Sequence, residues 1–324
     1  MLSNVSMNSN EKFEFTIQIV TYNPQWDKLR FTLDAILLQS FKNYEIQIVD
    51  DGSEDCLEEL IKEYVATHRI VNFQHIKNKQ NQGTVKNIIS GLERAQGKYV
   101  CCFGPGDSFA TIDALKMVHS YLDSNSFEAC WSPVQPFVCD DTGKRKEVYR
   151  AKPLDIDAYR EYHVNRIYEN MIVYSDQAHG ASMIMTRDKW LKYLCLIVDK
   201  VKYAEDLALV LLALEEEPVH LLDEVLIYYE VGEGISTRKD QEWINLLNED
   251  LNCLYRLAGE MFPNNPYIKK RARLNKFQKI NNLYLRTMLR FFVNPGMVFF
   301  LSRALMQRIM HKHYKQIENK IPLN

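Results

Sequence analysis

The chain has 324 residues, of which 46% are hydrophobic and 25% charged, proportions typical of a folded globular protein. Its formal net charge is −2, and 12 Gly with 10 Pro exclude a collagen-like or low-complexity chain. No uncharged apolar run approaches the ~20 residues needed to span a bilayer, and the first twelve residues lack the pattern of a secretory signal, so the sequence predicts a cytosolic protein.

The first hundred residues alternate between strand-like and helix-like segments. Residues 13–20 alternate apolar and polar side chains and are rich in β-branched residues, which predicts a strand. The same reasoning predicts helices over 26–39, 54–66 and 84–96, the last capped by Gly97, and strands over 44–49, 70–76 and 98–103. Repeated strand–helix units predict a doubly wound parallel sheet that binds ligands outside the carboxyl ends of its strands.

Polar segments follow three of these strands. They are Thr21-Tyr22-Asn23, Asp50-Asp51-Gly52-Ser53 and Gly104-Pro105-Gly106-Asp107. Each alone is explained by turns and helix caps, which use the same residue types. A parallel sheet, however, brings all three to one edge, and the sequence therefore predicts a shared crevice.

The residue types in this crevice favour a nucleoside diphosphate. Neither a GxGxxG nor a GxxxxGK[ST] segment occurs, so a dinucleotide fingerprint and a P-loop are excluded. Carboxylates at strand ends suit hydrogen bonds to a base or ribose. They also suit Mg²⁺ or Mn²⁺, which proteins hold through one or two carboxylates together with substrate phosphates.

Over residues 13–235 the chain resembles the inverting nucleotide-sugar glycosyltransferases of family 2. The resemblance rests on TYN at 21–23, DDGS at 50–53, NQGTVKN at 81–87, GPGD at 104–107 and the later pair Glu205-Asp206. It implies an α/β GT-A fold, with a doubly wound, mostly parallel sheet flanked by helices. It also implies a nucleotide-diphosphate sugar as donor, with a UDP-sugar as the first choice.

The resemblance implies a set of donor-binding residues. Thr21, Tyr22 and Asn23 would line the nucleoside pocket, and Asp50 or Asp51 would bond the base. The residues implied to lie near the ribose, the diphosphate or the donor sugar are Gly83, Lys86, Asn87 and Gly106. Lys86 stands where the family commonly has Arg, and a lysine neutralises phosphate without a bidentate fork.

The segment expected to bind a metal departs from the family pattern. The family usually has Asp-x-Asp-Asp here, and in Gly104-Pro105-Gly106-Asp107 only the last carboxylate remains. We expect Asp107, with diphosphate oxygens and water, to hold one Mg²⁺ or Mn²⁺. The alternative is a catalytically silent nucleotide- or carbohydrate-binding module with the same fold.

The second half of the chain supplies the expected catalytic acids. Residues 203–214 predict a helix with Glu205 and Asp206 in its first turn, where acids also occur as simple helix caps. The resemblance implies that Asp206 is the general base and Glu205 its neighbour. It also implies that the turn at His179-Gly180 lies beside the acceptor. The tyrosine-rich part of residues 135–178 predicts an acceptor wall or a helical lid.

The charge of the chain is unevenly distributed. From residue 261 onward there are 13 Lys and Arg but one acid, so the first 260 residues hold 27 of the 40 bases and 41 of the 42 acids. Residues 240–262 predict an amphipathic helix, and basic, aromatic-rich helical segments follow. This composition suits docking on an anionic membrane. A helical bundle that closes the core or a dimer interface is the alternative.

The sequence thus predicts a flexible segment (1–12), a catalytic domain (13–238) with donor and acceptor halves (13–108 and 109–238), and a basic helical region (239–324). We expect an inverting glycosyltransferase that uses a glycan or lipid-linked acceptor in bacterial surface polysaccharide synthesis. We expect it to be cytoplasmic or bound peripherally to the inner face of the membrane. We expect no nucleic-acid partner, and the sequence is compatible with a homo-oligomer. A nucleotidyltransferase would need a basic, Gly-rich segment after the first strand, and that segment is absent.

Overall fold

The structure, a computed structural model, describes residues 11–140, 142–149, 152–217, 219–232, 240–277, 280–310 and 316–323. Most of the segment predicted to be flexible (1–12) lies outside these residues. So does residue 238, the predicted boundary of the catalytic domain.

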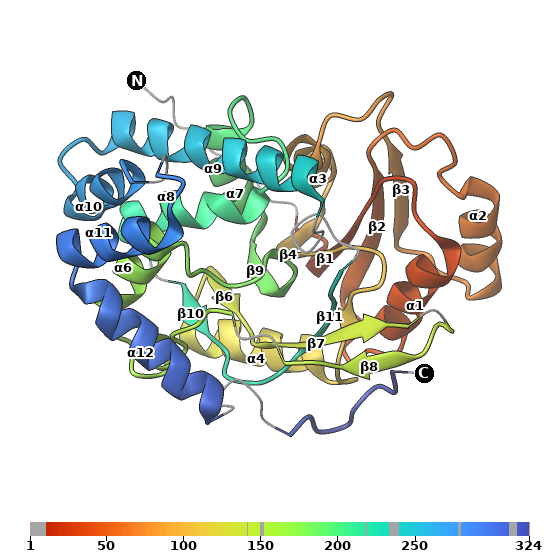
Figure 1. Cartoon of the computed structure of the whole chain (residues 1–324). Helices are drawn as coiled ribbons and strands as arrows, with labels where there is room; N and C mark the ends of the chain where they lie inside the picture. Colours follow the sequence, from red (N-terminus) through yellow and green to blue (C-terminus); the bar gives the residue numbers. More distant parts are fainter. Residues whose placement is uncertain are drawn as a thin grey trace.

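A seven-stranded sheet crosses the centre of the molecule in the order β10-β6-β9-β4-β1-β2-β3. Its strands pair in parallel, except that β9 runs antiparallel to both β4 and β6. Their bounds are β1 Phe13–Thr21, β2 Tyr44–Asp50, β3 Phe73–Lys77, β4 Gly97–Phe103, β6 Ala129–Trp131, β9 Met183–Thr186 and β10 His220–Leu221. The architecture is thus mixed α/β with a mostly parallel sheet, as the sequence predicts (Figure 1).

A second, four-stranded sheet lies beside the first, in the order β5-β11-β7-β8. Its strands are β5 Ser108–Phe109, β7 Val134–Cys139, β8 Arg145–Glu147 and β11 Ile227–Glu230. Strands β7 and β8 pair in the antiparallel sense. Because β5 follows β4 after the turn 104–107, this sheet brings the end of β11 against that turn.

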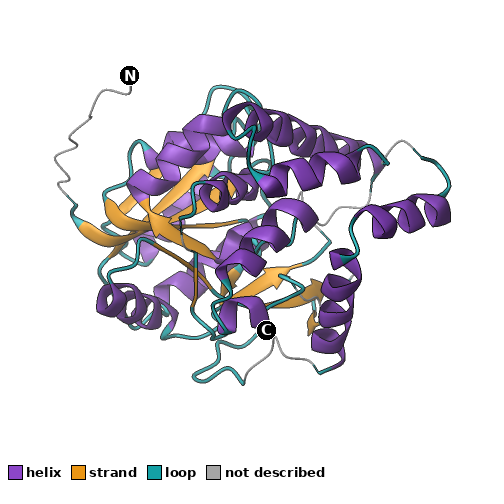
Figure 2. Ribbon diagram, turned by 90° about the vertical axis from the view of Figure 1, so that its left-hand side faces the viewer, coloured by secondary structure: helices purple, strands orange, loops and turns teal. Residues whose placement is uncertain are grey.

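Helices cover both faces of the central sheet, with the strands running between them (Figure 2). One core packs α1 (Trp26–Leu37), α2 (Glu58–Thr67) and α4 (Ala114–Asn125) against apolar side chains of β1 and β2. The opposite core contains the helices α3 Thr84–Leu92, α5 Asp157–Arg160, α6 Val164–Tyr174, α7 Arg187–Ile197 and α8 Ala208–Leu214. Buried, β-branched strands between two helical layers explain the apolar runs in the sequence.

Three local predictions need correction. The helix predicted over 54–66 begins at Glu58. The helix predicted to reach Gln96 ends at Leu92, and Gly97 is the first residue of β4 rather than a helix cap. A Cβ at Gly97 would lie 2.3 Å from the backbone nitrogen of Thr16, so close strand contact, and not helix termination, explains this glycine.

The tyrosine-rich stretch mainly packs the core. Tyr159 and Tyr168 are buried in the cluster formed with α6, α7 and α8, whereas Tyr162 is exposed and stacks on His220. Tyr159, Tyr168 and Tyr174 do not line the large cavity at the carboxyl edge of the sheet. The acceptor wall or helical lid stays a prediction.

The C-terminal region is helical, with α9 Gln241–Met261, α10 Pro266–Asn275, α11 Leu283–Val293 and α12 Gly296–Ile309. The helices α10, α11 and α12 gather on the side of the molecule opposite α1 and α2 (Figure 1). Residues 316–323 return beneath the second sheet, where Ile321 is buried. Among the described residues, each helix is too short or too polar to cross a bilayer.

Candidate active site

A cavity of about 770 Å³ opens at the carboxyl ends of β1 and β4. Its wall contains residues from the loops after those strands, from the start of α3, from the turn before β9 and from α9. Of the predicted site residues, those that line it are Thr21, Tyr22, Asn23, Asp51, Gly83, Asn87, Asp107, His179, Gly180, Glu205 and Asp206. The structure therefore brings together side chains that lie up to 185 residues apart in the sequence.

The two aspartates after β2 have different positions. Asp50 is directed into the protein: its Oδ2 accepts hydrogen bonds from the hydroxyls of Thr21 (2.9 Å) and Ser53 (2.6 Å). The pairing of Thr21 with Asp50 in the sheet register places these groups together. Asp51 lines the cavity, and its carboxylate accepts the backbone N–H groups of Gln82 (2.9 Å) and Gly83 (2.8 Å).

Burial raises the pKa of Asp51, although the hydrogen bonds from the Gln82 and Gly83 amides and from Asn78 oppose this shift. Asp51 thus fixes the loop before α3 at the cavity wall. Of the two aspartates, only Asp51 is placed to contact a ligand.

The start of α3 depends on two predicted residues. Gly83 has a φ of +91°, which L side chains rarely adopt, and a Cβ there would lie 2.4 Å from Cγ of Lys202. Asn87 donates to the carbonyl of Val49 (2.9 Å) and accepts from Asn78, so it ties α3 to the end of β2. Lys86 is exposed and does not line the cavity.

The polar groups of the turn 104–107 are hydrogen-bonded to one another and to residues of α1 and β11. Oδ1 of Asp107 accepts the backbone N–H of Glu230 (2.9 Å), and Oδ2 accepts that of Gly104 (3.3 Å). The Thr32 hydroxyl accepts the N–H of Gly106 (3.0 Å) and donates to the Asp107 carbonyl (2.7 Å). Burial raises the pKa of Asp107 to about 7.

These contacts fit the predicted divalent ion poorly. Both oxygens of Asp107 already accept backbone N–H groups, and positions 104 and 106 have no side chain to offer. Within the described part of the chain, no group of three His, Cys, Asp or Glu side chains is arranged to hold a metal. The Asp107 metal site stays a prediction from the sequence, and we route no chemical step through it.

Glu230 supplies a further carboxylate at this corner, one that the sequence reasoning missed. It is the last residue of β11, is 5% exposed and lines the cavity. Its Oε1 accepts from Nζ of Lys28, in the first turn of α1, at 2.9 Å. The two residues are 202 positions apart, so no local sequence pattern could have predicted this ion pair.

The acids Glu205 and Asp206 lie on a 3₁₀ turn, Glu205–Leu207, that precedes α8; the helix predicted over 203–214 therefore begins later, at Ala208. Asp250 of α9 holds the loop in front of this turn. Its buried carboxylate accepts the backbone N–H groups of Lys202 (2.9 Å), Tyr203 (2.7 Å) and Ala204 (3.0 Å).

Glu205 and Asp206 have contrasting surroundings. Burial, and next the charge of Asp206, raise the pKa of the Glu205 carboxyl. Asp206 is accompanied by two donors, Nζ of Lys152 at 3.5 Å and Nε2 of Gln177 at 3.4 Å. The buried surroundings therefore favour the protonated form of Glu205.

The turn at 179–180 adjoins this acid pair. A Cβ on Gly180 would lie 2.2 Å from Oε1 of Glu205, so only glycine allows the carboxylate to approach the backbone here. The ring of His179 lies 4.6 Å from that of Tyr229, and both line the cavity.

Helix α9 closes one side of the cavity with residues that the sequence reasoning assigned to a separate helical region. Trp243, Leu247, Asn248 and Leu251 line it, and the Trp243 ring packs edge-on to Tyr203 at 5.0 Å. The amphipathic pattern of residues 240–262 predicts the helix. It gives no indication that part of the apolar side faces a cavity.

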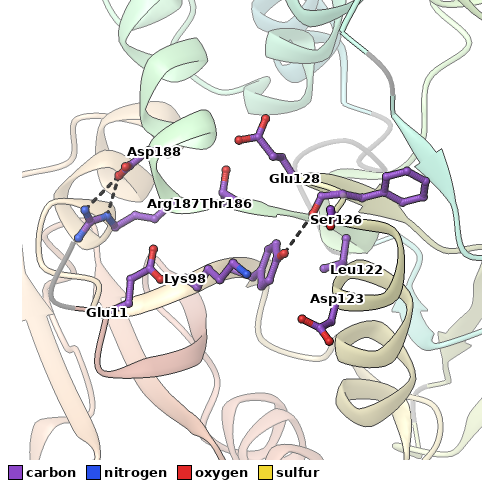
Figure 3. A pocket seen from close by; sticks show the side chains of 11 residues that line it. Glu11, Lys98, Leu122, Asp123, Ser126, Glu128, Thr186, Arg187 and Asp188 are labelled. Atoms are coloured by element: carbon purple, nitrogen blue, oxygen red, sulfur yellow. Dashed lines mark hydrogen bonds and ion pairs between the residues drawn. The ribbon is translucent and has the colours of Figure 1, made fainter. Parts of the chain in front are cut away.

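A smaller hollow of about 330 Å³ lies near the amino end of β4, away from this edge (Figure 3). Its wall mixes the bases Lys98 and Arg187 with acids such as Glu128. Arg187 is paired with the adjacent Asp188 at 3.0 Å. None of the predicted site residues lies in this hollow.

Comparison with known families gives one assignment. The profile of the family described as "Glycosyl transferase family 2" matches residues 16–192, more than half of the chain. The match includes the segments after β1, β2 and β4.

Curated relatives are similar over shorter stretches. An uncharacterized glycosyltransferase of Rickettsia felis is 31% identical over 107 residues, which are 32% of this chain and 17% of that protein. Glycosyltransferase GlyA of Streptococcus pneumoniae is 35% identical over 88 residues, or 27% and 12% of the two chains. A Mycoplasma pneumoniae homologue of the uncharacterized glycosyltransferase MG025 is 32% identical over 138 residues, or 42% and 43%. The chain spans less than half the length of these relatives.

Two solved structures share the fold. S. aureus TarS 1–349 in complex with UDP-GlcNAc aligns with a TM-score of 0.50 and 15% identity, over 96% of this chain and 97% of that one. The mannosyltransferase PcManGT of Pyrobaculum calidifontis, in complex with GDP-Man and Mn²⁺, aligns with a TM-score of 0.52 and 15% identity, over 93% and 88%. The arrangement of sheet and helices is that of GT-A glycosyltransferases.

Proposed function

The chain belongs to glycosyl transferase family 2, and from this membership we propose that it transfers a sugar from a nucleotide-diphosphate donor to a glycan or lipid-linked acceptor, with inversion at the anomeric carbon. One observation carries the proposal: Asp51, Asp107 and Asp206, from three distant segments, line a single cavity at the carboxyl edge of the sheet. Ligands of open α/β sheets bind at this edge.

Donor binding is assigned to the β1–α3 side of the cavity. Asp51 and Asn23 would contact the base and ribose, with Tyr22, which is 54% exposed, beside the nucleoside. A cavity of about 770 Å³ can hold a nucleotide sugar, since small-molecule sites usually measure ~300–1,000 Å³. The two solved structures are complexes with UDP-GlcNAc and with GDP-Man, which supports this class of donor without choosing between the bases.

Asp206 is assigned as the general base. Its carboxylate would accept the proton of an acceptor hydroxyl while that oxygen bonds to the anomeric carbon. The bond from this carbon to the diphosphate oxygen breaks on the opposite side, and the nucleoside diphosphate leaves with the electron pair. Glu205, beneath Gly180, would shape the acceptor side, together with His179.

Thermal stabilisation by a panel of UDP- and GDP-sugars tests the donor assignment. We expect at least one nucleotide sugar to raise the melting temperature of the full chain. Asp51→Ala should abolish this shift, because the variant loses a cavity carboxylate and releases the loop at Gly83. Glu54→Ala is the matched control, at an exposed acid three residues later in the chain.

No shift with any donor would contradict the proposal. Donor binding without turnover, by water or by any acceptor, would instead support a catalytically silent module.

We also propose that α11 and α12 dock on an anionic membrane, where a lipid-linked acceptor would be found. The two helices contain no acid and four arginines, Arg286, Arg290, Arg303 and Arg308. Large apolar side chains are exposed on both: Phe292 is 85% exposed and Phe299 65%. Exposed aromatic residues beside arginines match helices that lie in the interface of an anionic bilayer. Surface polysaccharide synthesis is consistent with such an acceptor.

Vesicle sedimentation tests the docking. The wild-type chain should sediment with phosphatidylglycerol vesicles and much less with phosphatidylcholine vesicles. Phe292→Asp with Phe299→Asp should remain in the supernatant, whereas Val71→Asp, at an equally exposed apolar residue between α2 and β3, should sediment normally. The membrane proposal fails if the wild type does not bind vesicles, or if the double substitution only converts a dimer into monomers.

A further inference from the structure

The corner of the cavity between α1, the 104–107 turn and β11 contains a positively charged side chain, that of Lys28. We propose that the ammonium group of Lys28, seated on Glu230, binds the diphosphate of the donor in place of a divalent metal ion. This inference rests on the proposed function. It adds a donor-binding residue that neither the family pattern nor the sequence reasoning assigns.

Glu230 occupies the space that a side chain at position 106 would need. Gly106 has a φ of +103°, and a Cβ built on it would lie 2.1 Å from Oε2 of Glu230. An aspartate at this position would therefore collide with the Glu230 carboxylate. The carboxylate that the turn lacks is supplied across the cavity by the end of β11.

This carboxylate is already paired with a cation. Oε1 of Glu230 lies 2.9 Å from Nζ of Lys28, whose side chain is 18% exposed and lines the cavity. A divalent ion bound to Glu230 would have to displace the ammonium or sit beside it, and like charges at this separation repel. The remaining carboxylate, Asp107, accepts two backbone N–H groups.

The ion pair orients Lys28 as well as neutralising Glu230. Lys28 is in the first turn of α1, which begins three residues after Asn23, a residue assigned to the nucleoside. A diphosphate attached to that nucleoside would extend along the same wall. An ammonium has three N–H donors, so Lys28 can keep its bond to Glu230 and still donate to phosphate oxygens.

The charge of the cavity makes such a cation necessary. The lining contains five acids, Asp51, Asp107, Glu205, Asp206 and Glu230, but among the residues described there only two lysines, Lys28 and Lys152. A diphosphate would meet net repulsion in this cavity unless a cation stood next to it. Lys152 lies beside Asp206 at 3.5 Å, which leaves Lys28 as the lysine on the 104–107 side.

Calorimetric titration of UDP and GDP, with and without metal, tests the inference. For the wild-type chain, the dissociation constant of the diphosphate that binds should be the same within about twofold in EDTA and in Mg²⁺ or Mn²⁺. Lys28→Met should weaken its binding about tenfold or more, as expected for the loss of a hydrogen bond between charged groups. The corresponding nucleoside should lose much less affinity.

Two further variants keep the test decisive. Lys28→Met leaves Glu230 buried without its cation, so the pair K28M/E230Q removes both charges, and it should show the same loss of diphosphate binding in a folded protein. Arg30→Met is the matched control, on the same helix but 55% exposed, and should bind like the wild type.

The possible results separate this inference from the proposed function. Binding that requires Mg²⁺ or Mn²⁺, or normal binding by K28M/E230Q, would overturn the role of Lys28 while leaving a glycosyltransferase. The absence of diphosphate and nucleotide-sugar binding under every condition would contradict the proposed function itself.

Discussion

Buried carboxylates organise the surroundings of Asp206 at the scale of single residues. Asp176 is buried and accepts the backbone N–H groups of Leu154 (2.6 Å) and Asp155 (3.1 Å). Lys152 comes shortly before these amides and Gln177 directly follows Asp176, so the two donors next to Asp206 are fixed by one carboxyl group. The sequence around Asp176 does not indicate that this residue holds the segments carrying Lys152 and Gln177.

The titration of Asp176 predicts a pH dependence of stability. Burial raises its pKa from 3.8 to about 7, so the folded chain retains a proton that the unfolded chain has lost over this range. Stability contributed by this group therefore falls as the pH rises from about 4 to 7. Asp176→Asn, which carries no charge at any pH, should show a shallower fall in the free energy of unfolding, measured by urea denaturation. An unchanged slope would show that Asp176 is not protonated in the folded chain.

Gly52, in the turn after β2, can be compared with Gly143, which precedes β8. Both Gly52 (φ +76°) and Gly143 (φ +81°) have positive φ, but a Cβ on Gly52 would lie 2.5 Å from the backbone carbon of Gln80, whereas nothing lies within 4 Å at Gly143. Gly143→Ala should cost about 1 kcal/mol of unfolding free energy, from backbone strain alone. Gly52→Ala should cost clearly more, by ~2 kcal/mol or above, because backbone must move. Equal losses would mean that the Gly52–Gln80 contact relaxes without cost.

At the scale of elements, α12 is fastened to the segment that carries Lys152. The buried carboxylate of Asp155 accepts hydrogen bonds from Arg166 (2.9 Å), Arg303 (3.1 Å) and Gln307 (3.0 Å). Gln307 also accepts the backbone N–H of Ile156 at 2.7 Å. Residues of the C-terminal region thus hold a loop that reaches the candidate catalytic base.

Gln307→Leu tests this connection. It removes two buried hydrogen bonds and leaves the backbone N–H of Ile156 without its partner, so we expect a loss of ~2–3 kcal/mol in unfolding free energy. Turnover should also fall while donor affinity remains, because Lys152 and Asp206 lose alignment. Met306→Leu, at an exposed neighbour on α12, should leave both quantities unchanged. A destabilised variant with wild-type turnover would limit the role of α12 to stability.

The sequence predicts elements and strand-end residues well, because each depends on local patterns. The alternation in residues 13–20 corresponds to β1, and the turn after β2 lies at the cavity as parallel pairing requires. The partners of these residues are less predictable. The ion pair between Glu230 and Lys28 depends on the pairing of β11 with β5. A strand of two residues such as β5 leaves almost no pattern in the sequence from which it could be predicted.

At the scale of the whole molecule, the C-terminal region and the sheet form one site. Helix α9 lines the cavity through Trp243, and through Asp250 it holds the loop before Glu205. Further along the same region, α11 and α12 present the exposed apolar residues that we propose to meet a membrane. A single chain would thereby position donor, base and acceptor surface relative to one another.

The measurement that tests the central claim most directly compares donor binding and turnover in Asp206→Asn. With a nucleotide sugar that binds the wild type, calorimetry should give the variant an affinity within about twofold, because we assign Asp206 to the acceptor side. Release of nucleoside diphosphate should fall by ~10²–10⁴-fold, the range expected when a general base is lost. Asp188→Asn, at an exposed acid outside the cavity, should behave as the wild type. Turnover within about tenfold of the wild type, or loss of binding together with turnover, would contradict the assignment.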